Sequence, residues 1–254
     1  MKAERLFAAA SRLRRAGVDP RIAEAEALGE PERRIVCSAL PYTMTSVARL
    51  VALVDAVRYC VRRGLAGDFA ECGVWRGGSV LAMILTLQEL GQSHRDIHLF
   101  DTFEGMTAPG ERDVSVSEEA AADVWRRAAA RGERPWPDLF DPQLVGLEAV
   151  RENLLATRYP PERLHFVRGP VEESLPRHAP ERLALLRLDT DWYESTRHEL
   201  RHLYPRLAQA GVLIVDDYGH WEGCRHAVDE YFAVAAEPPL LNRIDYTGRM
   251  GVKV

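Results

Sequence analysis

A glycine-rich stretch at residues 68–79, DFAECGVWRGGS, places the strongest constraint on how this chain folds. The short apolar run Phe69–Ala70 precedes the glycines, and the apolar segment Val80–Leu90 that follows them has helical spacing. A strand, a glycine turn and a helix in this order form the opening unit of a doubly wound α/β sheet. Glycines let the backbone approach a ligand closely, and the helix N-terminus presents free N–H groups. The sequence therefore predicts a Rossmann-like α/β domain with a ligand site at this turn.

The spacing within the turn indicates the kind of ligand. It is not the dinucleotide pattern G-x-G-x-x-G, because Glu71 and Trp75 stand where that pattern has glycine. An acid ahead of the turn suits a ligand with an ammonium or sulfonium group better than one with a pyrophosphate. The pattern E-x-G-x-x-x-G-G resembles the first motif of methyltransferases that use S-adenosylmethionine (SAM), although glycine turns in α/β folds also serve other nucleotides.

Composition predicts a cytoplasmic protein of one domain, residues 1–254, with neither nucleic acid nor membrane as a partner. The chain has 254 residues, 46% of them hydrophobic, which is enough for one large α/β core. The net charge of −5 argues against nucleic acid. The four cysteines have no C-x-x-C spacing, as in reduced proteins. Residues 1–15 fit an amphipathic helix rather than a signal peptide, and no run approaches the roughly 18 apolar residues of a membrane span.

The apolar pattern predicts a helical cap at residues 1–63 and a Rossmann-like core at residues 64–254. Within the cap, Val47, Leu50 and Val54 recur at helical spacing after Ser46, and Gly64 is a plausible C-cap. We expect this cap to close one side of the active site or to form a contact between subunits. After the first strand, the expected elements are strands at Ile97–Phe100, Leu164–Val167, Leu183–Leu188 and Gly211–Val215, helices at Ser195–Leu203 and after Glu222, and antiparallel edge strands within Leu240–Val254.

Residues 106–160 are too long for a simple crossover between strands. They contain Trp125 and Trp136, several prolines and a helix-like segment, Val145–Leu155. Long connections inside compact domains are usually functional or disordered, and tryptophans favour partial burial. We interpret this segment as an insertion, or lid, over the acceptor site. The alternative is that the tryptophans only anchor a long loop.

Asp101 follows the second predicted strand. Nucleoside-binding sheets place a carboxylate for the ribose hydroxyls at this position. The alternative is an ordinary turn or helix-cap aspartate. Together with the glycine turn, the position favours ribose binding.

Further acids follow the fourth and fifth predicted strands, and the C-terminal ends of parallel strands meet at one edge of a sheet. Asp191, Asp216 and Asp217 lie on adjacent strand ends in the expected order. Neighbouring buried carboxylates repel one another unless a cation compensates them. Three carboxylates with no Cys/His pair nearby favour Mg²⁺, although helix caps or surface acids would explain any one of them.

A metal at this edge could bind two neighbouring hydroxyls of an acceptor and lower the pKa of one. A general base must then take the proton. Asp191 is the first candidate, because it lies between the expected cofactor and metal sites. His220 is the second candidate, although a lone histidine in a polar loop is more often structural.

Six short motifs follow one another in a specific order between about residues 40 and 232. They are Tyr42-Thr43-Met44, Glu71-x-Gly73-Val74-Trp75-Arg76-Gly77-Gly78, Phe100-Asp101-Thr102-Phe103-Glu104-Gly105, Gly169-x-Val171-Glu172, Asp189-x-Asp191 and Asp216-Asp217-Tyr218. This set resembles the macrocin O-methyltransferase (TylF) family of sugar O-methyltransferases. The N-terminal forty residues and residues 106–160 match least well, and these parts are expected to choose the acceptor.

The resemblance implies a class I methyltransferase fold, with SAM as the methyl donor and Mg²⁺ as the activator. It also implies a sugar hydroxyl acceptor, on a glycosylated natural product or a nucleotide-linked deoxysugar of antibiotic or secondary-metabolite biosynthesis. Asp191, Asp216 and Asp217 match the family's metal ligands. The implied SAM site comprises Tyr42, Thr43, Met44, Glu71, Gly73, Trp75, Gly77, Gly78, Ser79, Asp101, Phe103, Gly169, Val171, Glu172 and Asp189. A helical cap outside the sheet indicates a homodimer or a larger ring.

Other functions remain as alternatives at this point. A metal-dependent glycosyltransferase would use Asp189-Thr190-Asp191 as a D-x-D motif, but it would leave the glycine turn without a role. A catechol-type small-molecule O-methyltransferase would differ only in its acceptor. A nicotinamide oxidoreductase has the wrong glycine spacing, and a non-catalytic scaffold would not need three metal-type carboxylates.

Overall fold

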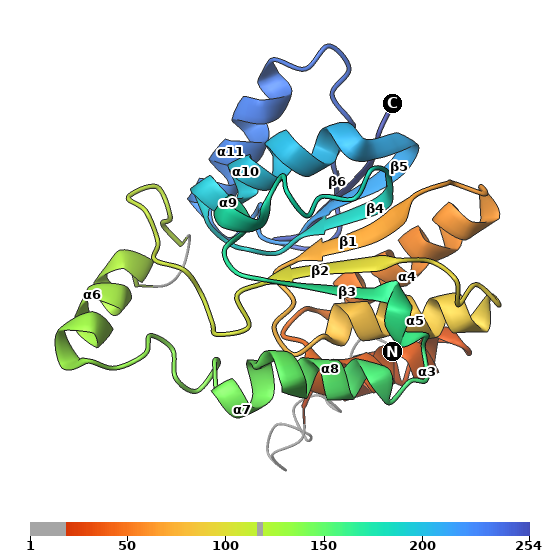
Figure 1. The fold of residues 1–254 in the computed structure, drawn as a ribbon, viewed down its shortest axis with the longest axis horizontal. Helices are drawn as coiled ribbons and strands as arrows, with labels where there is room; N and C mark the ends of the chain where they lie inside the picture. The colour runs from red at the N-terminus through yellow and green to blue at the C-terminus, as the bar shows by residue number, and fades with distance from the viewer. Residues whose placement is uncertain (1–18, 116–118) are drawn as a thin grey trace, which may run out of the picture.

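The computed structural model describes residues 19–115 and 119–254, and within them seven strands form one sheet (Figure 1). The strand order is β3-β2-β1-β4-β5-β7-β6. Strands β1 to β5 are parallel to one another, whereas β7 is antiparallel to both β5 and β6. The strands are β1 Asp68–Cys72, β2 Ile97–Asp101, β3 Leu164–Arg168, β4 Leu183–Leu188, β5 Leu207–Val215, β6 Asn242–Arg243 and β7 Arg249–Val252. This sheet confirms the predicted α/β class, including the antiparallel C-terminal edge.

The strands form where apolar runs are buried on both faces, as expected for a parallel sheet covered by helices. All six residues of β4 are buried. Strand β5 begins at Leu207, earlier than the predicted start at Gly211. Its apolar pattern is interrupted by the exposed Gln209 and the half-buried Ala210. The φ of Ala210 is +63°, and the interruption coincides with a shift in the register against β4. Because such a break in the apolar pattern is typical of a turn, the sequence predicted a shorter strand.

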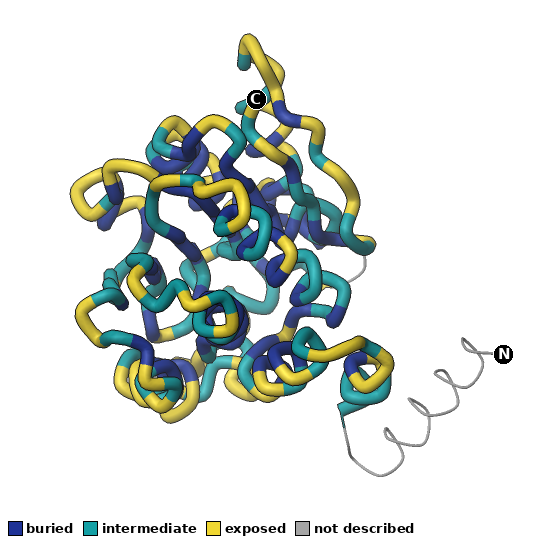
Figure 2. Tube along the Cα trace, turned by 90° about the vertical axis from the view of Figure 1, so that its right-hand side faces the viewer, coloured by how far each residue is buried: buried dark blue, intermediate teal, exposed yellow. Residues whose placement is uncertain are grey.

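Helices cover both faces of the sheet (Figure 1). One face carries α3 (Glu32–Ala39), α4 (Val47–Arg62), α5 (Gly78–Glu89) and α8 (Leu147–Leu155). The other carries α9 (Val171–Ser174), α10 (Tyr193–Leu203) and α11 (Glu222–Ala233). The shorter helices are α2 Arg21–Ala25, η1 Leu40–Tyr42, α7 Pro142–Val145, η2 Pro161–Arg163 and η3 Tyr204–Arg206. Figure 2 shows the buried positions toward the inside of the molecule and the exposed positions mostly at its periphery.

The N-terminal segment contributes to one of these layers. Helix α4 begins after Ser46, whose side chain accepts a hydrogen bond from the backbone N–H of Arg49, as an N-cap does. Its apolar side contacts β4, β5 and α5, and Leu50, Val54 and Val57 are fully buried there. Helix α4 is therefore part of the core packing. The amphipathic helix expected in residues 1–15 lies outside the described residues.

The insertion is shorter than the sequence indicates. The predicted helix Val145–Leu155 corresponds to α8, which begins at Leu147 after Gly146 in an extended conformation, while Val145 ends the separate short helix α7. Helix α8 packs on the sheet layer, since its Val150 and Leu154 are fully buried. The segment that leaves the core therefore ends near Gly146. It contains α6 (Ala121–Arg131), which projects away from the sheet in Figure 1.

Across residues 19–115 and 119–254, no helix combines the length and the apolar character that crossing a bilayer requires.

Candidate active site

A pocket of about 350 Å³ opens at the C-terminal ends of β1, β2, β4 and β5. Ligands of open α/β sheets bind at this edge. The predicted site residues that line it are Thr43, Met44, Gly73, Trp75, Ser79, Asp101, Gly169, Val171, Glu172, Asp189, Asp191, Asp216, Asp217 and His220. Five further predicted residues are not part of the pocket lining, and these are Tyr42, Glu71, Gly77, Gly78 and Phe103. The fold thus collects most of the predicted site residues in one cavity.

The glycines of the turn allow close contacts between backbone segments. Gly73 has a φ of +82°, and a Cβ atom there would lie 1.8 Å from the carbonyl oxygen of Asp189. A Cβ atom at Gly78 would lie 2.5 Å from the carbonyl oxygen of Tyr42. The turn between β1 and α5 therefore packs directly against the end of β4 and against η1. Ser79, in the first turn of α5, remains at the pocket wall.

Asp101 connects the glycine turn to the end of β2. Its Oδ2 accepts hydrogen bonds from the backbone N–H groups of Val74 (2.6 Å) and Trp75 (3.1 Å). Its Oδ1 accepts one from Phe103 (2.6 Å). Burial raises the pKa of Asp101, while these backbone hydrogen bonds oppose the rise. The Thr102 hydroxyl also lies 3.5 Å from Oδ1. Since a carboxylate oxygen can accept two hydrogen bonds, a ligand hydroxyl at Oδ1 would take the place of this long contact.

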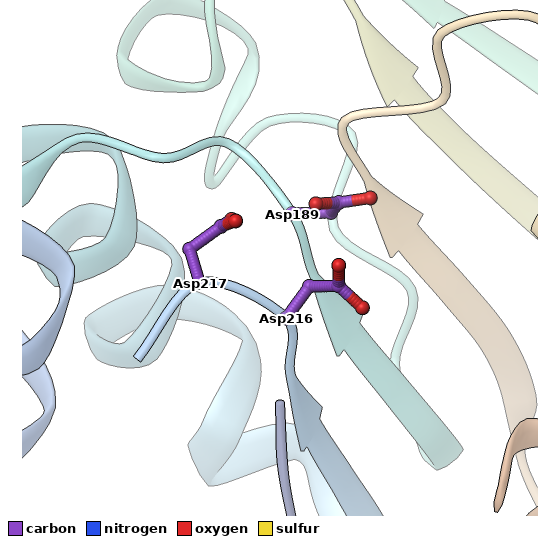
Figure 3. Close-up of side chains that lie close together, drawn as sticks. All are labelled: Asp189, Asp216 and Asp217. Atoms are coloured by element: carbon purple, nitrogen blue, oxygen red, sulfur yellow. The ribbon is translucent and has the colours of Figure 1, made fainter. Parts of the chain in front are cut away.

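Three carboxyl groups meet where β4 and β5 end (Figure 3). Asp189, Asp216 and Asp217 each place one oxygen within 4.8 Å of the others. Asp216 and Asp217 are only 2% and 8% exposed, so water screens their charges poorly. Burial and the neighbouring acids raise the pKa of Asp217 well above its ordinary value, and burial raises that of Asp216 to about 6. Three oxygen donors that repel one another fit a hard divalent cation.

This carboxylate cluster differs from the sequence-based ligand set, because it contains Asp189 where that set has Asp191. The backbone N–H of Asp189 still bonds to the carbonyl of Cys72, so Asp189 continues the sheet ladder. Asp191 lies beyond the strand with a φ of +68°. Its Oδ1 accepts a hydrogen bond from Nε1 of Trp221 at 2.7 Å. The D-x-D spacing alone does not show whether Asp189 or Asp191 points toward the end of β5.

Two arginines that the sequence analysis did not single out neutralise part of this charge. Arg187 on β4 is buried and forms ion pairs with Asp189 (2.6 Å), Asp216 (2.5 Å) and Glu71. Arg49 on α4 forms ion pairs with Asp216 and with Asp245 (3.0 Å). A sequence signal existed for Arg187, since it is the charged residue inside the buried run LALLRL, and buried charges require partners.

Glu71 belongs to this ion network behind the pocket wall. It is 1% exposed, and burial raises its pKa to about 8 even though Arg187 opposes the rise. Its Oε2 has no hydrogen-bond partner among the described residues. Glu71 therefore acts on the pocket through Arg187 rather than as part of the lining.

The TylF family model, described as macrocin-O-methyltransferase, matches residues 13–251. The chain belongs to this family. It is therefore a SAM-dependent O-methyltransferase, and the alternatives of a glycosyltransferase or a nicotinamide oxidoreductase fall away.

Individual proteins that are similar to this chain are also named as O-methyltransferases. A Streptomyces olivaceus enzyme, 8-demethyl-8-(2,3-dimethoxy-alpha-L-rhamnosyl)-tetracenomycin-C 4'-O-methyltransferase, is 34% identical over 83% of this chain and 75% of its own. The demethyldecarbamoylnovobiocin O-methyltransferase of Streptomyces niveus is 32% identical over 80% of this chain and 73% of its own. The solved structure of the O-methyltransferase NovP is 31% identical, with a TM-score of 0.70, and covers 84% of this chain and 82% of its own. The class I methyltransferase fold is thus confirmed.

In this O-methyltransferase the insertion supplies part of the pocket wall. Trp136 lines the pocket, and its ring centroid lies 6.4 Å from that of Trp192. Trp192 contacts Trp221 edge to face at 4.8 Å, and Trp125 of α6 lies 6.5 Å from Trp136 on the outer side. His220 lies at the same wall, where its ring packs edge-on against Trp221. An aromatic wall therefore links the insertion to the indole that contacts Asp191.

Proposed function

We propose that this O-methyltransferase transfers a methyl group from SAM to a sugar hydroxyl, with Mg²⁺ as activator. The acceptor would be a glycosylated natural product or a nucleotide-linked deoxysugar of antibiotic or secondary-metabolite biosynthesis. A further relative, the mycinamicin III 3''-O-methyltransferase of Micromonospora griseorubida, is 32% identical over 75% of this chain and 70% of its own. Its name and that of the tetracenomycin enzyme specify 3''- and 4'-O-methylation, which supports this acceptor class. The observation that carries the proposal is the carboxylate cluster of Asp189, Asp216 and Asp217 beside the glycine turn in one pocket.

The proposed SAM site is the part of the pocket around the glycine turn. Its lining residues are Thr43, Met44, Gly73, Trp75, Ser79, Asp101, Gly169, Val171, Glu172 and Asp189. Asp101 would accept a ribose hydroxyl at Oδ1, and Gly169–Glu172 would adjoin the adenine. Tyr42, Glu71, Gly77, Gly78 and Phe103 would shape the site from behind this lining. The position of Ser79 supports this assignment, because it brings the first turn of α5 to the pocket wall.

The proposed metal ligands are Asp189, Asp216 and Asp217. When bound, SAM supplies an electrophilic methyl group and Mg²⁺ lowers the pKa of an acceptor hydroxyl. Arg187 and Arg49 hold Asp216 in place from the side of the core. Mutual repulsion among the three acids favours a bound cation over an empty cluster.

Asp191 is the proposed general base. Trp221 occupies its Oδ1 and fixes its orientation, which leaves Oδ2 to accept the proton of the acceptor. Burial and the charge of Asp189 raise the pKa of Asp191 well above its ordinary value, as suits a proton acceptor. His220 also lines the pocket and remains the second candidate for the base.

Asp191→Asn tests this function and the choice of base together. The variant should lower the rate of methyl transfer about a hundredfold or more, as loss of a general base does. Its affinity for SAM in calorimetry should stay within about twofold. His220→Asn is the matched control and should lower the rate less than about tenfold. Normal turnover by Asp191→Asn, or a larger loss in His220→Asn, would remove Asp191 from this role.

We also propose a homo-oligomer that works in the cytoplasm. Its four cysteines are free thiols, which fits a reducing compartment. Sedimentation of the purified protein would test the oligomer, and a monomer at micromolar concentration would contradict it.

A further inference from the structure

A buried carboxyl group lies directly below the turn that carries Asp189 and Asp191. Glu199 on α10 is 0% exposed, and its Oε1 accepts a hydrogen bond from the Thr190 hydroxyl at 2.8 Å. Thr190 is the residue between the two aspartates. Its hydroxyl also lies 2.9 Å from the Ser195 hydroxyl, in the first turns of α10. We refer to Thr190, Ser195 and Glu199 as the Thr190 anchor.

The Thr190 anchor holds the turn from Asp189 to Trp192, which has an unfavourable backbone conformation at Asp191. Asp189 is fixed by its backbone bond to Cys72, but the chain then leaves the sheet. Asp191 has a φ of +68°, which costs a non-glycine residue on the order of 1 kcal/mol and persists only where the surroundings impose it. The backbone bond from the N–H of Trp192 to the carbonyl of Thr190 (2.7 Å) closes the turn but does not attach it to the core. Asp191 attaches it on one side, because its backbone N–H donates to Oδ2 of Asp217 at 3.3 Å and its Oδ1 accepts from Trp221. The side chain of Thr190 attaches it on the other side, to α10.

The environment of Glu199 indicates a role other than stabilising the fold. The neighbouring charges that raise its pKa are those of Glu172 and Asp189, and no ion pair with a cation is found for it among the described residues. Burial, the largest cause, also raises its pKa well above the ordinary value, while the hydrogen bond from Thr190 opposes the rise. A buried carboxyl group is costly compared with an apolar residue of similar size. The position that the Glu199 carboxyl group gives to Thr190 explains why an acid occupies this buried place.

We propose that Glu199 is a positioning residue, which fixes Thr190 by a hydrogen bond and thereby sets the directions of Asp189 and Asp191. Asp189 then joins Asp216 and Asp217, while Asp191 meets Trp221. The inference rests on the proposed function, because it assumes that Asp189 binds metal and that Asp191 is the base. It adds a residue outside the pocket lining, on which both roles depend.

Three variants separate the hydrogen bond from the packing. Glu199→Gln keeps the shape and can still bond to Thr190, whereas Glu199→Leu fills similar space without this bond. Thr190→Val removes the hydroxyl from the other side. Glu199→Leu and Thr190→Val should each lower kcat and Mn²⁺ affinity about tenfold or more, as loss of supporting contacts around a metal site does. Glu199→Gln should stay within about threefold of the wild-type protein, and the KM for SAM should not change in any of them.

Two further measurements keep the test decisive. The double variant Glu199→Leu/Thr190→Val should be no worse than either single variant, because both remove the same bond. Hydrogen exchange at residues 189–193 should be faster in Glu199→Leu than in Glu199→Gln, with equal urea midpoints. This exchange reports on the turn even if the wild-type protein neither binds Mn²⁺ nor transfers methyl groups, in which case the proposed function fails separately. The inference is overturned if Glu199→Leu exchanges like the wild-type protein, or if Glu199→Gln is as defective as Glu199→Leu.

Discussion

Gly73, the residue after β1, lets the backbone pack directly against Asp189, the residue after β4. A Cβ atom there would lie 1.8 Å from the Asp189 carbonyl oxygen and 2.5 Å from its carbonyl carbon. Gly73→Ala should therefore displace both strand ends at the pocket. We expect a loss of more than about 2 kcal/mol in the free energy of unfolding, and SAM affinity at least about tenfold weaker. Urea unfolding and calorimetric titration with SAM would measure the two effects.

Gly64 offers the matched control, because its φ is also positive, at +62°, but no atom lies within 4 Å of a Cβ placed there. Gly64→Ala should cost only the backbone strain, about 1 kcal/mol, and leave SAM affinity unchanged. Equal effects of the two substitutions would show that the contact at Gly73 does not matter to the site.

Asp216 and Asp217 are adjacent acids with different surroundings. Arg187 and Arg49 both pair with Asp216, whereas the other acids dominate the charges near Asp217. In EDTA, Asp216→Asn should lower the free energy of unfolding by about 3 kcal/mol, because it breaks buried ion pairs. Asp217→Asn should leave that free energy equal or higher, because it removes repulsion. Both should weaken Mn²⁺ binding in calorimetry; a stable Asp216→Asn protein would contradict the role given to the arginines.

At the scale of elements, the insertion places two aromatic residues, Trp136 and Phe140, at the pocket. Trp136 lines the cavity, whereas Trp125 on α6 contacts Trp136 from outside it. Trp136→Ala should raise the KM for the acceptor about tenfold, about 1.4 kcal/mol, and leave SAM affinity unchanged. Trp125→Ala is the control and should change this KM less than about threefold. A change in SAM affinity but not in acceptor KM would contradict the assignment of this wall to the acceptor.

The helices and strands were predictable from the sequence where the apolar pattern alone determines them. The apolar runs at β1 to β4 and the helical spacing of α4, α5 and α10 gave positions within a few residues of those observed. The pattern failed where backbone conformation overrides it. Ala210 interrupts β5 with a φ of +63°, and the extended Gly146 delays the start of the helix predicted at Val145–Leu155 to Leu147. Neither residue type specifies its conformation without the surrounding contacts.

The sequence predicted which edge of the sheet carries the candidate site. It did not predict the directions in which the side chains point. The glycine turn, Asp101 and the acids after β4 and β5 line one pocket, as their strand-end positions indicate. The distinction between Asp189 and Asp191 depends on the left-handed conformation of Asp191, and the role of Arg49 depends on how α4 packs beside β5. Both are consequences of tertiary packing, which spacing along the chain does not contain.

At the scale of the whole molecule, the buried acids make stability depend on pH. Glu71 has a pKa raised from 4.5 to about 8 in the folded protein, mainly by burial. Between these pH values the folded state binds one more proton than the unfolded state, so this stabilisation is present at low pH and is lost as pH rises through about 8. In EDTA, Glu71→Gln should lose stability with rising pH less steeply than the wild-type protein, by up to about 1.4 kcal/mol per pH unit. Urea unfolding as a function of pH measures this slope, and equal slopes would contradict the raised pKa.

The central claim is that this pocket transfers a methyl group from SAM to a sugar hydroxyl with the help of a metal held by Asp189, Asp216 and Asp217. The most direct test follows the label of methyl-labelled SAM into a panel of glycosylated natural products and nucleotide-linked deoxysugars, in Mg²⁺, in EDTA, and in EDTA followed by excess Mg²⁺. We predict label on a sugar oxygen of at least one acceptor, its loss in EDTA and its return with Mg²⁺. Undiminished transfer in EDTA, or label on an atom other than a sugar oxygen, would contradict the account.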